Sequence, residues 1–248
     1  MLKYILRRTR NIALYGFGDQ ARQRKRADKD VARVNRFNSE VWDREQTVAR
    51  RRYASYEEYL EHQAAKLDEI NDRLQERYDE DVVRFRTRFA ACEELKDHSA
   101  VLCLGARLGA EVEAFIALGH FSVGIDLNPG EENRFVLPGD FNKLIFADGS
   151  VDAVYTNVLD HVFQLDLVLN EVHRILKPDG LFIVELIEGF EEGFTPGRYE
   201  AFMWRDVDTA AGLLQESGQF RVVARRSAGV FKRQHWTQVV LKKASPTN

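Results

Sequence analysis

Apolar residues recur at steps of three and four between Ser55 and Phe89, and charged residues occupy the opposite face. This spacing predicts a long amphipathic helix, broken at most once, ahead of the main domain. Ser55 followed three residues later by Glu58 matches a capping box, which places the helix start. We expect the apolar face to pack on the body of the protein. A homodimer formed through this N-terminal helix is the alternative.

After residue 100, short apolar stretches alternate with helical patterns, which is typical of an α/β fold with a parallel sheet and right-handed crossovers. Two further strands that close the chain are expected to form an antiparallel edge. The predicted strands are Val101–Leu104, Ser122–Asp126, Val151–Thr156, Leu181–Leu186, Phe220–Arg226 and Trp236–Lys242, and the predicted helices are Glu111–Leu118, Leu165–Leu176 and Asp206–Ser217.

Length and composition describe an ordinary globular protein. The chain has 248 residues, 44% of them hydrophobic, and a formal charge of −3, which excludes a fibrous or largely disordered protein. We divide it into a basic arm and helical extension, residues 1–92, and a main domain, residues 93–248. The two cysteines lack zinc-like spacing, and no apolar run approaches the roughly 20 residues of a membrane span. These features indicate a cytoplasmic protein without a metal site.

Positive charge gathers in the first 26 residues, which hold eight Lys or Arg and a single acid, Asp19. This arm predicts a peripheral contact with phospholipid head groups or with an acidic partner. Because the whole chain is slightly acidic, nucleic acid is not the expected partner.

The segment from Val101 to Val112 carries the first sign of chemistry. A buried strand runs into a turn with glycines at Gly105 and Gly109, followed by a helix. Glycine allows the backbone to bend sharply and approach a ligand, and a helix start offers free N–H groups. Asp126 ends the next strand, 21 positions after Gly105. An acid at that distance accepts hydrogen bonds from ribose hydroxyls in nucleotide-binding α/β folds.

Three downstream segments resemble the class I S-adenosylmethionine-dependent methyltransferases, and in particular a methyltransferase type 11-like domain. They read GDFNKLIFADGSVD (139–152), AVYTNVLDHV (153–162) and LNEVHRILKPDGLFIV (169–184). The resemblance implies a Rossmann-like doubly wound sheet of seven mostly parallel strands with an antiparallel last strand. It also implies methyltransferase activity with S-adenosylmethionine as cofactor.

The resemblance assigns cofactor-binding roles residue by residue. The glycine turn would wrap the methionine part, Asp126 would hold the ribose, and Asp140 would meet the adenine amino group. The full set is Gly105, Ala106, Arg107, Gly109, Asp126, Leu127, Asp140, Phe141, Asn157 and Val158. Two departures stand out: Cys103 replaces the family's acid, and Arg107 replaces its middle glycine. We expect Arg107 to point its charge toward the cofactor carboxylate. Crowding of the pocket by Arg107 is the alternative.

Transfer to an alcohol would need a base, and His161 is the candidate. The expected acceptor is a small molecule or glycan, methylated at oxygen, with Arg198, Tyr199 and Trp204 lining its pocket. The alternatives are a catalytically inactive cofactor-binding or scaffold protein of the same fold, a nucleic-acid methyltransferase, and a nicotinamide-dependent oxidoreductase.

Overall fold

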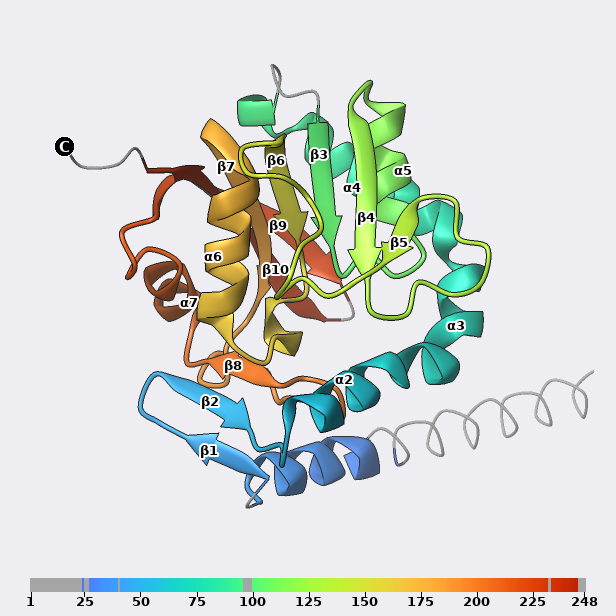
Figure 1. Ribbon diagram of the computed structural model, residues 1–248. Helices are drawn as coiled ribbons and strands as arrows, with labels where there is room; N and C mark the ends of the chain where they lie inside the picture. Colours follow the sequence, from blue (N-terminus) through green and yellow to red (C-terminus); the bar gives the residue numbers. More distant parts are fainter. Residues whose placement is uncertain (1–23, 25–26, 40, 96–99, 232, 245–248) are drawn as a thin grey trace, which may run out of the picture.

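A seven-stranded sheet forms the centre of the protein (Figure 1). The computed structural model describes residues 24, 27–39, 41–95, 100–231 and 233–244. The strand order is β5-β4-β3-β6-β7-β10-β9. The strands are β3 (Ala100–Leu104), β4 (Phe121–Asp126), β5 (Val136–Pro138), β6 (Val151–Thr156), β7 (Leu176–Ile187), β9 (Phe220–Phe231) and β10 (Gln234–Lys243).

The predicted fold class is confirmed. Strands β5, β4, β3, β6 and β7 pair in parallel, and β10 pairs antiparallel with both β7 and β9. The last strand in sequence is therefore the antiparallel one, as expected. It lies between β7 and β9, so the two closing strands together form the antiparallel edge that was expected, with β9 outermost.

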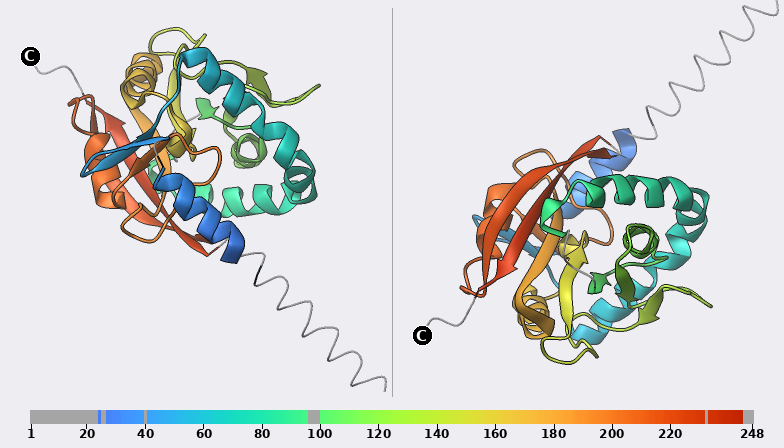
Figure 2. Two further views of the ribbon diagram at one scale, coloured as in Figure 1. Left: turned by 90° about the horizontal axis from the view of Figure 1, so that it is seen from below. Right: turned by 90° about the horizontal axis from the view of Figure 1, so that it is seen from above.

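Helices cover both faces of the sheet (Figures 1 and 2). On one face lie α6 (Leu165–Ile175) and α7 (Val207–Leu213), and on the other lie α4 (Tyr78–Ala90) and α5 (Ala110–Ala117). Each face has its own apolar core, centred on residues such as Val172 and Leu186 on the α6 side and Phe89 and Phe115 on the α4 side. Removing these side chains from water supplies the main driving force for the two layers.

The predicted long helix is three helices, α2 (Tyr56–Ala64), α3 (Lys66–Glu76) and α4, so the expectation of at most one break was wrong. Its start is confirmed: Ser55 Oγ accepts the Glu58 N–H at 3.2 Å. At Arg77 the backbone leaves the helical region, with φ −114° and ψ 4°. The two breaks turn the chain around the sheet (Figure 2), which a straight amphipathic rod could not do.

The apolar stripe of these helices packs on the protein itself. Tyr59, Leu67, Phe85 and Phe89 are each at most 6% exposed. The expectation of packing on the body is thereby confirmed, and the homodimer stays a prediction.

A second, three-stranded sheet joins β1 (Trp42–Arg44), β2 (Val48–Arg51) and β8 (Phe202–Trp204), with Val48 opposite Trp204. The sequence analysis did not predict it. Its buried side chains belong to the same core as α6 and β7, so the segment before residue 93 and the main domain share one core. The division at residue 92 stays a prediction.

The parallel strands β3, β4 and β6 all end on the side where α2 and α3 cross below the sheet (Figure 1). In open α/β sheets, ligands bind outside these carboxyl ends. None of the helices in the described part of the chain has the length and hydrophobicity needed to span a bilayer.

Candidate active site at the carboxyl ends of the strands

The turn between β3 and α5 adopts left-handed backbone conformations, with φ of 70° at Gly105, 46° at Arg107 and 90° at Gly109. Gly105 cannot be replaced freely, since an added Cβ would lie 2.3 Å from Val158 Cγ2. The Gly105 N–H donates to the Ile125 carbonyl at 2.7 Å. Glycine therefore lets the turn lie tightly between the ends of β4 and β6.

Asp126 ends β4 and is 3% exposed. Its Oδ2 accepts the Arg107 N–H at 3.0 Å, and its Oδ1 accepts the Asn128 N–H at 2.9 Å. The Arg107 guanidinium also faces this acid, with Nη1 3.5 Å from Oδ1. Within the described residues this buried Nη1 makes no hydrogen bond. The arginine that replaces the family's glycine is thus turned toward the predicted ribose ligand.

Asp140 follows β5 and contacts the helical extension. Its Oδ2 accepts a 2.5 Å hydrogen bond from the Tyr56 hydroxyl, and its Oδ1 accepts the Asn142 N–H at 2.8 Å. Burial, together with the hydrogen bond to Asp140, raises the pKa of Tyr56. Phe141, 6% exposed, lies beside it and lines a cavity with Asp126. Asp140 and Phe141, which were predicted to contact the adenine, therefore lie next to α2.

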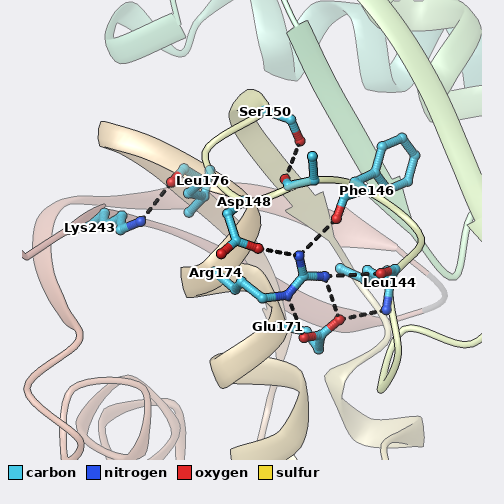
Figure 3. Close-up of polar contacts among 9 residues, drawn as sticks. Leu144, Phe146, Asp148, Ser150, Glu171, Arg174, Leu176 and Lys243 are labelled. Atoms are coloured by element: carbon cyan, nitrogen blue, oxygen red, sulfur yellow. Dashed lines mark hydrogen bonds and ion pairs between the residues drawn. The ribbon is translucent and has the colours of Figure 1, made fainter.

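A guanidinium network holds the loop at Leu144, Phe146 and Asp148 (Figure 3), which follows Asp140 and Phe141 in the sequence. Arg174 on α6 donates to the carbonyls of Leu144 at 2.9 Å and Phe146 at 2.8 Å, and pairs with Asp148 at 2.7 Å. Glu171 orients the guanidinium and accepts the Leu144 N–H at 2.6 Å. The acid and arginine of the motif at residues 169–184 thus brace this loop.

His161 lies just past β6 in the short helix η2 (Leu159–His161). Its Nδ1 lies 2.8 Å from the Tyr199 carbonyl oxygen, so Nδ1 carries a proton that it donates there. Its Nε2 lies 2.7 Å from the Lys66 ammonium, and accepts a hydrogen bond from it. Burial first, and Lys66 second, lower the pKa of His161 well below its usual value. His161 is therefore a neutral ring whose Nε2 lone pair is occupied by the hydrogen bond from Lys66.

Lys66 is the functional candidate that the sequence analysis missed. It begins α3, and burial lowers its pKa to about 8 although Asp160 and Glu200 act to raise it. Close to it is a group of three titratable side chains, Asp160, His161 and Glu200, whose polar atoms lie within 4.8 Å of one another. A signal was present, since Tyr59, Gln63 and Lys66 follow the helical spacing of the apolar stripe and therefore share its inward face.

Two cavities meet at the predicted cofactor turn. One is lined by Asp126, Leu127, Phe141 and His161, and the other by the turn itself, residues 105–110, with Asn157 and residues of α3 and α4. Four residues line both: Lys66, Gly105, Arg107 and Val158. All ten predicted cofactor residues except Asp140 line one of these cavities, and Asp140 precedes Phe141 directly.

The predicted acceptor residues are placed differently. Trp204 is 2% exposed in β8, and its Nε1 donates to the Ile187 carbonyl at 2.9 Å, so this ring is part of the core; its contact with an acceptor stays a prediction. Arg198 is exposed and pairs with Glu69. Tyr199 is buried and stacks on His62, and its carbonyl holds His161. That loop therefore covers and orients the site more than it lines a pocket.

Comparison with known proteins agrees with this geometry. Residues 102–184 match the sequence profile of a methyltransferase domain. An uncharacterized methyltransferase of Synechocystis is 30% identical over 144 residues, which cover 50% of this chain and 66% of the relative. Residues 102–184, which match the profile, include the glycine turn, Asp126, the Asp140 loop and His161.

Solved structures show the same fold. A Burkholderia thailandensis 1,6-didemethyltoxoflavin-N1-methyltransferase, determined with bound 1,6-didemethyltoxoflavin and S-adenosylhomocysteine, superposes with a TM-score of 0.63 at 18% identity; the match covers 82% of this chain and 97% of that protein. A putative Haloferax volcanii methyltransferase, in complex with its Trm112 activator, gives 0.50 at 18% identity, over 74% and 97% of the two chains.

Proposed function

Residues 102–184 form a methyltransferase domain of the class I S-adenosylmethionine-dependent family, and on that premise we propose that the chain methylates a small molecule or glycan at oxygen. One observation carries the proposal. Asp126 at the end of β4 is hydrogen-bonded to the left-handed turn after β3, where two cavities meet beside Val158. S-adenosylmethionine consists of an adenosine and a methionine part, and two adjoining cavities beside an acid at a strand end are what its two parts require.

The residues present fit this cofactor. The cavity beside Asp126, Leu127 and Phe141 would take the adenosine, and the cavity along the glycine turn and Asn157 would take the methionine part. The Arg107 guanidinium lines both cavities, and its buried Nη1 makes no hydrogen bond in the described structure; it lies 3.5 Å from Asp126, and we expect it to turn to the cofactor carboxylate when the cofactor binds. When bound, S-adenosylmethionine supplies a methyl group on a positively charged sulfur. The protein aligns the partners and excludes water.

Oxygen as the acceptor atom is supported by His161. Its Nδ1 is held by the Tyr199 carbonyl, so Nε2 carries the lone pair; that lone pair accepts the hydrogen bond from Lys66, which an acceptor hydroxyl would have to replace. His161 and Val158 line the same cavity, which brings the candidate base next to the place where the two cavities meet. A small-molecule acceptor agrees with the Burkholderia N1-methyltransferase, whose structure contains the small molecule 1,6-didemethyltoxoflavin.

Cofactor binding is tested by calorimetry. S-adenosylmethionine should give a saturable heat, and Asp126→Ala should weaken binding by about 1–3 kcal/mol through the lost charged hydrogen bonds. Transfer of a labelled methyl group into a fractionated metabolite and glycan pool would then identify the acceptor class. An unchanged affinity in Asp126→Ala would contradict the placement of the ribose.

A catalytically inactive protein of the same fold is the second candidate, because Arg107 pairs with Asp126, the acid that the ribose requires. Arg107→Gly separates the two. If Arg107 holds the cofactor carboxylate, the glycine variant binds S-adenosylmethionine more weakly. If Arg107 blocks Asp126 in an inactive site, the wild type gives no saturable heat and the glycine variant does.

The basic arm, most of which lies outside the described residues, extends the proposal to a membrane or acidic partner. Removing residues 1–26 should abolish binding to anionic liposomes and leave cofactor affinity intact. Loss of cofactor affinity would instead make the arm part of the active site. A homodimer through the N-terminal helices is tested by sedimentation.

A further inference from the structure

Glu111 is a buried acid in the wall of the cavity that runs along the glycine turn. It is the second residue of α5, is 6% exposed, and lines this cavity with Gly105, Arg107 and Asn157. The hydrogen bond that acts on its carboxyl group comes from its own backbone N–H. A buried acid that faces a cavity without a cation beside it calls for an explanation.

Glu111 also lies near Cys103, the residue that stands where the resembling family has an acid. Burial, and next the carboxyl group of Glu111, raise the pKa of the Cys103 thiol well above its usual value. Cys103 shares one apolar core with Ala110 and Val112, the residues on either side of Glu111. The acid that β3 lacks is therefore present in the same region of the fold, on α5.

The cations that line this cavity already have partners. Within the described residues, none of them forms a salt bridge with Glu111, and Asp81, the other acid in the cavity wall, is held by Arg77 and Arg84. The pairs in the cavity wall are Arg84 with Asp81 at 2.8 Å, Arg107 with Asp126 at 3.5 Å and Lys66 with His161 at 2.7 Å. Glu111 is therefore the acid of this cavity that is open to a ligand.

The electrostatic surroundings of Glu111 favour a cation. Burial first, and then the acids Asp126, Glu185 and Asp81, raise the pKa of Glu111 to about 8. At pH 7 the carboxyl group in the empty cavity is mostly protonated, which avoids the cost of a buried charge. An ammonium group beside it would favour the ionised form, because opposite charges attract strongly in a buried site.

Building on the proposed function, we propose that Glu111 binds the ammonium group of the methionine part of the cofactor. Arg107, which lines the same cavity, would take the carboxylate of that part, so that the two charged ends of the amino acid meet opposite charges. The ammonium group enters with its proton already bound. Glu111 therefore releases its own proton to solvent as the ion pair forms.

The test compares nucleosides that differ by one charged group. S-adenosylhomocysteine carries both groups, its deaminated analogue lacks the ammonium, and its decarboxylated analogue lacks the carboxylate. Each is titrated by calorimetry into the full-length wild type, Glu111→Gln and a control, Glu113→Gln. Glu113 lies on the same helix, accepts a hydrogen bond from Tyr78 at 2.9 Å and lines neither cavity at the glycine turn.

We expect Glu111→Gln to lose about tenfold or more of its affinity for S-adenosylhomocysteine and for the decarboxylated analogue, both of which carry the ammonium. Its affinity for the deaminated analogue should stay within about threefold of the wild type, and Glu113→Gln should match the wild type with every ligand. The wild type itself should bind the deaminated analogue about tenfold or more less tightly than S-adenosylhomocysteine.

Proton release provides a second measurement. Titrations at pH 7 in buffers of different ionisation enthalpy should show that the wild type releases about one proton more than Glu111→Gln per S-adenosylhomocysteine bound. With the deaminated analogue this difference should vanish. The other titratable groups around Glu111 are the same in both proteins, and they are Lys66, Tyr78, Asp81, Cys103, Asp126, Tyr155 and Glu185.

Three results would each overturn the role of Glu111. They are an unchanged affinity of Glu111→Gln for S-adenosylhomocysteine, an equal loss for the deaminated analogue, and equal binding of these two ligands by the wild type, which needs no variant. If S-adenosylhomocysteine fails to bind the wild type, the proposed function itself fails, and the role of Glu111 fails with it.

Discussion

Replacing Lys66 by Met should make the protein more stable near neutral pH. The pKa of this lysine falls from 10.5 to about 8 on folding, because burial disfavours the charged form. A difference of roughly 2.5 pH units corresponds to about 3 kcal/mol at any pH below both values. Loss of the hydrogen bond to His161 offsets about 1 kcal/mol of this. The expected net gain is about 2 kcal/mol.

The sign of the pH dependence follows from the same difference. Between pH 8 and 10.5 the unfolded chain binds a proton at Lys66 that the folded chain has released, so wild-type stability rises with pH. The Met variant has no such group, so its advantage should shrink across this range. Burial, with Glu200, raises the pKa of Asp160 to about 7 although Lys66 acts to lower it. Without Lys66, Asp160 would take up a proton more readily.

Urea unfolding at pH 7 and pH 10, for the wild type, Lys66→Met and a control, Lys242→Met, measures the effect. Lys242 pairs with Asp179 at 3.0 Å, outside both cavities. A gain of about 2 kcal/mol at pH 7 corresponds to a melting temperature higher by about 4–8 °C for a chain of this size. The control should match the wild type. A Met variant less stable than the wild type at pH 7, or a stability difference that stays constant up to pH 10, would refute the reasoning.

Three further variants probe other contacts. Arg174→Met removes three contacts to the loop at residues 140–150, with Leu144, Phe146 and Asp148, and should cost about 2 kcal/mol with faster amide exchange there; unchanged exchange would contradict the bracing role. Arg88→Met removes the ion-pair partner of Glu185, whose side chain is 1% exposed, and should cost about 3 kcal/mol at pH 7 by urea unfolding. Because burial raises the pKa of Glu185, this loss should shrink as the pH falls; an equal loss at pH 5 would contradict it. Tyr56→Phe removes the hydrogen bond to Asp140 and should cost about 1 kcal/mol and speed amide exchange in α2, whereas unchanged protection would show that α2 docks without it.

Local pattern determined much of the central sheet. Strand β6 has the predicted bounds, and β3, β4 and α6 differ from theirs by one residue at an end. The glycine turn and Asp126 were also predicted from spacing, and the structure brings them into direct hydrogen bonding. These features follow from periodicity and backbone conformation, which neighbouring residues set.

Contacts between distant segments were decided by the tertiary structure. Strand β8 pairs with β2, some 150 residues earlier, and neither short strand shows a period of its own. In the sequence Lys66 is one of many charged residues in a predicted helix. Only the folded chain places its ammonium against His161. The sequence predicted that Trp204 contacts the acceptor, and only the structure shows that its side chain is buried in β8. A sequence specifies which faces are apolar, but burial and pairing between remote segments are settled only when those faces meet, because the energy of a buried charge or a strand pair depends on the partner it finds.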